Sequence, residues 1–204
     1  ARPGCARRVV DAWAPVVASV HATTPARVGI RLDGGDLLPG DLVPGGRLDQ
    51  AWLGRVTAAG FGLVELSCPP QLAGPDELPH FAALCAAVRA GLPGGATLAV
   101  AVTYHPARDF DPDPVLEVCS ALRDHDVEVV TLRAGPPGEE LLGEERRWRH
   151  QALGGLVRAE AGMHVLLDGG VLDGDEAETA VLAGRADVCV GRPRLTGGSW
   201  QADP

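Results

Sequence analysis

The sequence predicts an α/β fold, a parallel (β/α) barrel of the TIM type in which about six of the eight strands are recognisable, and three observations support it. Six nearly continuous runs of Val, Ile and Leu recur along the chain, as is typical of strands buried on both faces. Amphipathic helical segments separate these runs, which indicates parallel strands joined by right-handed crossovers. No GxGxxG motif follows the first run, which favours a barrel over an open doubly wound sheet.

The predicted strands are the six apolar runs in chain order: RVGIRL (27–32), FGLVEL (61–66), TLAVAV (97–102), VEVVTL (127–132), MHVLLD (163–168) and DVCVG (187–191). Six strands are two short of a complete barrel, and residues 1–25 carry a helical apolar stripe with no strand before it. We therefore expect one barrel domain over residues 1–204, as the carboxyl-terminal part of a larger barrel or as a barrel that a partner completes.

The helices between these strands are predicted from their caps, apolar stripes and glycine stops. Their expected limits are Asp49 to Gly60, residues 76–90 before Gly91, a start at Asp113 and Pro114, and Asp173 to Gly184. The last of these has Asp175 and Glu176 in its first turn, where negative charge interacts favourably with the helix dipole.

Charge and composition exclude several classes of function. The net charge is −9 and the arginines are scattered, which argues against a nucleic-acid partner. No apolar run reaches the roughly 18 residues of a spanning helix and no signal peptide opens the chain, so we expect no membrane partner and a cytoplasmic protein. There is no lysine, which removes Schiff-base mechanisms.

Cysteine and histidine spacings predict neither disulfides nor a metal site. The five cysteines form no CxxC pair, and Cys85 and Cys119 fall on apolar helical stripes, which indicates reduced core thiols. Cys68, in the stretch SCPP, has no nearby histidine to activate it and is interpreted as a buried thiol. The six histidines show no metal-ligand spacing.

Two glycine-containing stretches near the carboxyl terminus carry a family resemblance. GRADVCVGRPRL (184–195) and LLDGGV (166–171) resemble the phosphate-binding end of the old yellow enzyme family of FMN oxidoreductases. AAGFGLVELSCP (58–69) and HDVEVVTLRAG (125–135) resemble the fourth and sixth strands of one branch, the reductase-like half of the bifunctional salicylyl-CoA 5-hydroxylase and aminobenzoyl-CoA monooxygenase/reductase flavoproteins. The resemblance covers most of residues 3–200 and implies FMN as cofactor.

The same resemblance implies a degraded active site. Ser67, Pro70 and Leu72 stand where the family has a carbonyl-binding histidine pair and a proton-donating tyrosine. Ala101 stands in place of an arginine that faces the flavin, and Arg31 in place of a glutamine. Proline, leucine and alanine side chains offer no hydrogen bond. We therefore expect the usual ene-reductase activity to be lost.

A cofactor-binding site is predicted at the ends of the last two strands. Successive glycines let backbone N–H groups approach a phosphate, and an arginine can complete the site with two parallel hydrogen bonds. The candidates are Gly169, Gly170, Gly191 and Arg192. Their expected ligand is FMN or another phosphorylated molecule, and flavin affinity is a property that the degraded barrel could have lost.

Other polar residues follow the predicted strands, where barrels hold catalytic groups. Tyr104, the one tyrosine, and His105 are the predicted acid/base pair, with ordinary loop residues as the alternative. The remaining polar residues at strand ends are Asp33, Ser67, Thr103, Arg133 and Asp168.

Two functions remain open from sequence. The first is a flavin-oxidoreductase-type barrel that acts on a small organic molecule, aromatic or of the acyl-CoA or polyketide type, without the usual ene-reductase residues. The alternative is a flavin-free degenerate barrel that serves as a structural or partner domain or catalyses a non-redox rearrangement. The expected partners are a small-molecule ligand, and either a fused monooxygenase domain or a second subunit over the open barrel edge.

Overall fold

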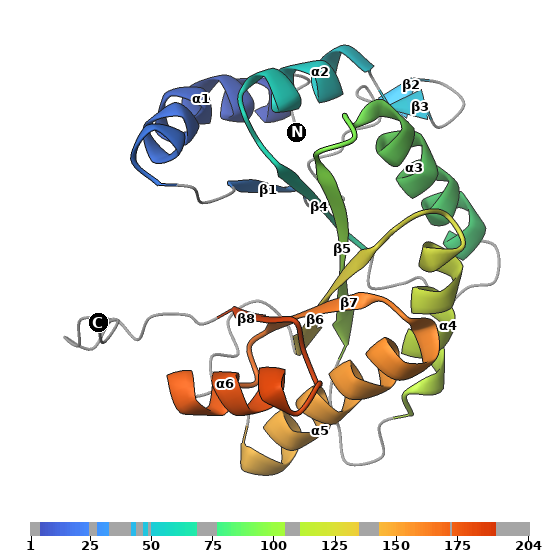
Figure 1. Cartoon of the computed structure of the whole chain (residues 1–204). Helices are drawn as coiled ribbons and strands as arrows, with labels where there is room; N and C mark the ends of the chain where they lie inside the picture. The colour runs from blue at the N-terminus through green and yellow to red at the C-terminus, as the bar shows by residue number, and fades with distance from the viewer. Residues whose placement is uncertain are drawn as a thin grey trace.

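Six parallel strands form one curved sheet at the centre of the molecule (Figure 1). The computed structural model describes residues 5–24, 28–32, 42–43, 47–48, 50–68, 77–104, 111–134, 143–171 and 173–190. The sheet order is β1-β4-β5-β6-β7-β8, which follows the chain, and each neighbouring pair is parallel. Its strands are β1 (Gly29–Leu32), β4 (Leu63–Ser67), β5 (Thr97–Tyr104), β6 (Val129–Ala134), β7 (His164–Asp168) and β8 (Val188–Val190).

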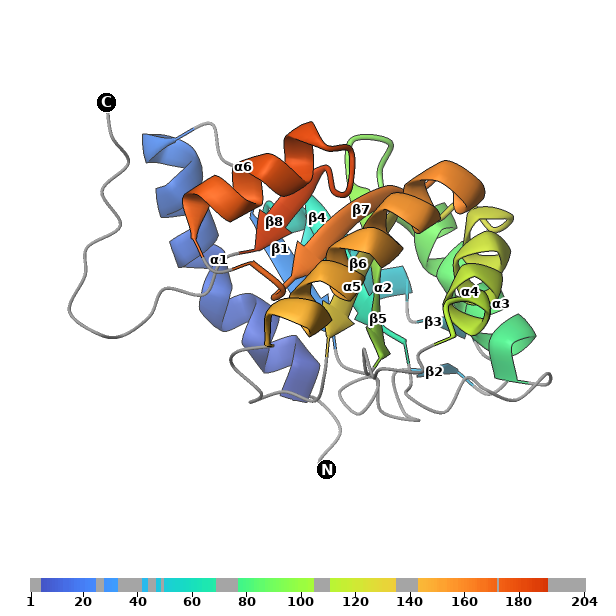
Figure 2. The same cartoon turned by 90° about the horizontal axis from the view of Figure 1, so that it is seen from below.

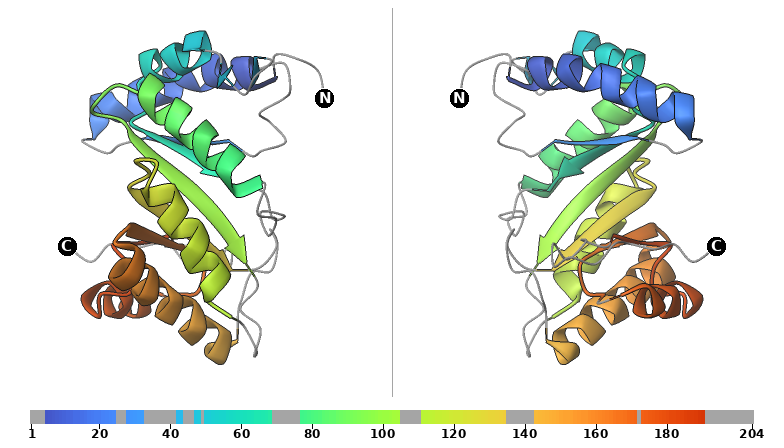
Figure 3. Two further views of the ribbon diagram at one scale, coloured as in Figure 1. Left: turned by 90° about the vertical axis from the view of Figure 1, so that its right-hand side faces the viewer. Right: turned by 90° about the vertical axis from the view of Figure 1, so that its left-hand side faces the viewer.

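Helices alternate with the strands and cover the convex face of the sheet, as Figure 3 shows for α3, α4 and α5. The helical elements are α1 (Cys5–Thr23), α2 (Gln50–Ala58), α3 (Glu77–Gly91), α4 (Asp113–Arg123), α5 (Glu144–Leu156), which continues as the π-helical turn η1 (Val157–Ala161), and α6 (Gly174–Leu182). None of these described helices is long and apolar enough to cross a lipid bilayer.

Strand alternation divides the sheet into an apolar face and a polar face. Val64, Val100, Val130 and Leu167 lie on the convex face and are fully buried beneath the helices. Within each strand, the residues next to these point to the concave face, because successive side chains of a strand alternate sides. The convex face therefore holds the hydrophobic core, and the concave face is left for polar groups.

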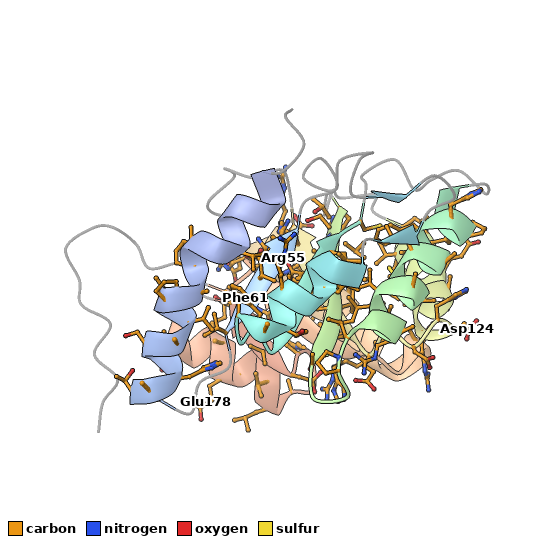
Figure 4. The ribbon with its side chains drawn as sticks, turned by 90° about the horizontal axis from the view of Figure 1, so that it is seen from above. Arg55, Phe61, Asp124 and Glu178 are labelled. Atoms are coloured by element: carbon orange, nitrogen blue, oxygen red, sulfur yellow. The ribbon has the colours of Figure 1, made fainter. Side chains whose placement is uncertain are left out.

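The predicted barrel fold is confirmed as a six-stranded, incomplete barrel, with each predicted apolar run contributing one strand. Three of the strands, β1, β4 and β6, begin two residues later than predicted. At β4 the reason is the end of α2, where Gly60 has a φ of 92° and the Phe61 amide donates to the Val56 carbonyl at 3.3 Å. Figure 4 shows α1, α2 and α3 from above, with Phe61 at the end of α2.

The last helix begins as predicted, and one small sheet was not predicted. Asp173 accepts a hydrogen bond from the Glu176 amide at 2.9 Å and so caps α6. The predicted cap at Asp49 lies outside the described residues. Two short antiparallel strands, β2 (Leu42–Val43) and β3 (Arg47–Leu48), form a separate sheet between β1 and α2.

The sheet is open between its first and last strands. β1 bonds to β4 and β8 bonds to β7, and the two do not pair with each other. Figures 1 and 2 show α1 and α6 on the same side of the molecule, flanking this opening.

Candidate functional site

Four charged side chains and one hydroxyl meet on the concave face of the sheet. We call Arg31, Glu65, Thr131, Arg133 and Asp168 the inner charge cluster. They come from β1, β4, β6 and β7. The register places Arg31 beside Glu65 and Arg133 beside Asp168, so all of them share one face.

Each carboxylate of the cluster contacts both guanidinium groups. Arg31 donates from Nε to Glu65 Oε1 and from Nη2 to Asp168 Oδ2, the latter at 3.4 Å. Arg133 donates from Nε to Asp168 Oδ2 at 2.8 Å and from Nη2 to Glu65 Oε1 at 3.5 Å. Thr131 donates from Oγ1 to Glu65 Oε2 at 2.6 Å. The result is a closed ring of alternating charges.

Two alanines explain how charges from non-adjacent strands can meet. Glu65 on β4 reaches Thr131 and Arg133 on β6, although β5 lies between them and separates their backbones by about 9–10 Å. The concave side of β5 at this level carries Ala99 and Ala101, both fully buried. Their small side chains leave the space that the longer charged side chains fill.

The cluster is buried at its centre and open at one residue. Glu65 and Asp168 are only 5% and 4% exposed, whereas the Arg31 side chain is 41% exposed. Desolvation by burial lowers the pKa of Arg31, but hydrogen bonds and charge interactions with Glu65 and Asp168 outweigh it and raise the pKa above its ordinary value. Arg31 is therefore a fixed positive charge that reaches solvent.

The cluster lies toward the carboxyl ends of the strands, where barrels bind ligands. Asp168 is the last residue of β7 and leads into a turn at Gly169 and Gly170, both with positive φ (85° and 74°). The Gly170 carbonyl accepts a hydrogen bond from Gln151 Nε2 of α5 at 3.1 Å. The predicted glycine turn is thus held rigidly beside the inner charge cluster.

Tyr104 lies behind the sheet and faces α5, with its hydroxyl bonded to His150 Nδ1 and its ring stacked on the imidazole at 5.6 Å between centroids. Burial raises the pKa of Tyr104 and lowers that of His150 to about 4. Both groups are therefore uncharged at neutral pH, and the pair packs α5 against the sheet.

The structure bears unevenly on the other sequence predictions for the site. Burial raises the pKa of the Cys68 thiol to about 12, which agrees with the interpretation as a buried thiol. His105, Gly191 and Arg192 lie outside the described residues, so the acid/base pair and the phosphate site stay predictions.

Sequence reasoning singled out Arg133 and Asp168 but missed Glu65 and Thr131. A usable signal existed, because Glu65 interrupts the otherwise apolar run LVELS, and a charge in the middle of a doubly buried strand needs a partner. Arg31, interpreted as a lost glutamine, belongs to the same ring.

Comparison with known proteins yields structural similarity only. No family model and no curated protein matches the sequence. The carboxyl transferase domain of Rhizobium etli pyruvate carboxylase, solved with 3-bromopyruvate, is 12% identical with a TM-score of 0.61, and the match covers 91% of this chain and 30% of that one. A putative lyase/mutase from Burkholderia cenocepacia J2315 is 19% identical with a TM-score of 0.57, and the match covers 89% of this chain and 61% of that one.

The resemblance to old yellow enzyme and its FMN oxidoreductases is wrong. The solved structures named above are a carboxyl transferase domain and a putative lyase/mutase rather than flavin oxidoreductases. The motifs that suggested the family were apolar strand segments and short glycine turns at strand ends, which parallel barrels of many activities share.

At this level of identity the matches establish architecture alone, and the chain spans less than two thirds of the proteins it matches. The residues that the structure describes therefore form a six-stranded, incomplete (β/α) barrel, with a ring of buried charges on its inner face.

Proposed function

We propose that this chain forms the ligand-binding wall of a (β/α)-barrel enzyme that carries out a non-redox reaction on a small organic acid. The observation that supports it is the inner charge cluster, in which two buried carboxylates hold the guanidinium of Arg31 at the solvent-accessible edge. Even a fully satisfied set of buried ion pairs adds little net stability compared with apolar packing, which favours a binding role for this one.

The geometry of Arg31 suits a carboxylate ligand. Its Nε and Nη2 atoms point to Glu65 and Asp168, while Nη1 bonds to none of the residues that the structure describes. A guanidinium held by two carboxylates keeps its remaining N–H groups in a fixed direction. An incoming carboxylate can then accept two parallel hydrogen bonds from the outer edge of Arg31.

The two arginines also suit the chemistry of carbanions next to a carboxylate. When a bond to the adjacent carbon breaks, negative charge spreads onto the ligand's oxygens, and preorganised positive groups stabilise that charge. Arg31 would contact the ligand, and Glu65 and Asp168 would act as positioning residues for it. No redox step is needed for this class of reaction.

The structural matches support the non-redox alternative better than the flavin reading. The Rhizobium etli domain was solved with pyruvate as well as with 3-hydroxypyruvate, and the Burkholderia protein is described as a putative lyase/mutase. These descriptions belong to those proteins and lend direction to the proposal here.

Ligand titration tests the proposal. Pyruvate and its uncharged amide, pyruvamide, are titrated into the protein and followed by isothermal calorimetry and NMR. We expect pyruvate to bind and pyruvamide not to bind. Arg31→Gln is expected to lower the affinity for pyruvate at least tenfold, because a charge-assisted hydrogen-bond pair is lost. Arg149→Gln is the matched control, since Arg149 pairs with Glu145 on the exposed side of α5. Equal affinity in both variants would contradict the assignment of Arg31.

A structural role is the second candidate, because the cluster satisfies its own charges. On that view the ring fixes the strands relative to one another, and no small acid binds. Absence of binding for pyruvate, malonate and succinate, combined with strong destabilisation by loss of the ring, would favour this role.

A further inference from the structure

The two edge strands leave a defined part of the barrel wall missing. The six strands run in chain order, and β1 and β8 each bond to a single described neighbour. A closed barrel of this type has eight strands. A closed barrel of this type would therefore have two further strands between β1 and β8, each parallel to its neighbours.

Helix α1 marks the position of one missing strand. It precedes β1 and packs outside the sheet next to α2, with Val10 and Val17 buried. In right-handed crossovers the helix before a strand returns from a parallel neighbour in the same sheet. β4 already occupies one side of β1. The strand that precedes α1 therefore belongs on the other, open side of β1.

Burial of the inner face falls away toward both edges of the opening. Ala99 and Thr131 at the centre of the sheet are buried, whereas Val188 of β8 is 49% exposed. The helices beside the opening also carry exposed apolar side chains, with Trp13 on α1 and Leu182 on α6 exposed by 54% and 79%. Apolar groups at sheet edges mark surfaces that other polypeptide covers.

We propose that the opening is the seat of a strand–helix–strand segment of polypeptide from outside these 204 residues. One strand would bond to β1 beneath α1, the other would bond to β8, and the helix between them would pack on the outside next to α1. A second copy of this chain does not fit, because an arc of six strands is wider than a gap of two. The segment would also stand beside Arg31 without covering it, so the inner charge cluster would gain a wall. This inference rests on strand order and burial, independently of the proposed chemistry.

The test compares the 204-residue chain with the assembly isolated from the cells that make it. Native mass spectrometry is expected to give a mass above 21.1 kDa, from a polypeptide, attached or separate, that contains two apolar strand runs flanking a helix. Hydrogen exchange is expected to show β1 and β8 amides at least 100-fold less protected in the chain alone than in the assembly, with β5 unchanged. A chain that folds only in the assembly would give the same support.

Matched variants locate the contact. If the segment is a separate polypeptide, Trp13→Asp and Val188→Asp are expected to weaken its binding to the chain at least tenfold. If it is covalently joined to the chain, the same substitutions are expected to increase hydrogen exchange of the β1 and β8 amides. Trp148→Asp is the control, because Trp148 is equally exposed but lies on α5 against Arg185. A lone 21.1 kDa monomer with protected β1 and β8 amides would overturn the proposal. A homodimer formed through the opening between β1 and β8 would also overturn it.

Discussion

Removing Arg133 should destabilise the fold more than any surface charge. Arg133 contacts Asp168 at 2.8 Å and Glu65 at 3.5 Å, and both carboxylates are buried. In Arg133→Met the aliphatic volume stays, but the two buried carboxylates lose one of the two guanidinium groups that pair with them, and the other, Arg31, has a side chain that is 41% exposed. Each lost charged hydrogen bond costs about 1.5–3 kcal/mol, and breaking a buried ion pair costs about 3–5 kcal/mol. We expect a loss near the upper part of that range.

Urea unfolding followed by circular dichroism at pH 7 measures this loss. With a slope of about 2–3 kcal/mol/M, the midpoint should fall by about 1.3–2.5 M. Arg146→Met is the control, because Arg146 is exposed on α5 and surface substitutions usually change stability by no more than about 0.5 kcal/mol. The double variant Arg133→Met with Asp168→Asn should recover part of the loss, because one unpaired charge disappears. A loss below about 1 kcal/mol for Arg133→Met would refute the ring as a coupled unit.

Three further expectations concern the elements around the cluster. Gly170→Ala should destabilise the protein by about 2–4 kcal/mol in urea unfolding, because its Cβ would lie 2.2 Å from His150 Cδ2 and the backbone is left-handed; Gly169→Ala, where the Cβ has open space, should cost only about 1 kcal/mol. Burial lowers the pKa of His150 from 6.5 to about 4, so as the pH falls the unfolded chain takes up this proton before the folded one, and stability should fall by up to about 3 kcal/mol as pH drops from 6.5 toward 4. His150→Gln should flatten that part of the pH–stability profile. An unchanged profile would count against a buried neutral imidazole. Burial raises the pKa of Cys85 and Cys119 to about 12, so a disulfide reagent should label both only as fast as the chain opens, and rapid labelling in buffer would show the thiols to be accessible.

Apolar runs predicted the sheet well because a strand buried on both faces needs an apolar side chain at nearly every position. Val, Ile and Leu supply these side chains, so each run located one strand. The pair β2 and β3 was missed because each strand has only two residues, too few for any alternation to show. The offset at β4 arose from the hydrogen bond between Phe61 and Val56, which a pattern of side chains does not encode.

The site was predicted less well than the fold for a related reason. Asp168 and Arg133 were found because they stand at strand ends, but Glu65 lies inside a strand and its partners on β6 are 66 and 68 residues away in sequence. Only the curvature of the sheet brings these groups together. The family assignment failed because a glycine turn reports a backbone angle, and the same angle serves many chemistries.

The alanines of β5 carry a consequence for how this protein responds to mutation. Ala99 and Ala101 let charged side chains two strands apart contact the same partners. The stability changes caused by substituting Glu65, Arg133 and Asp168 are therefore coupled across three strands. Single substitutions among them should then cost similar amounts that do not add. Variation in this interior would proceed by exchanging the whole set, and a larger side chain on β5 would separate it into two independent pairs.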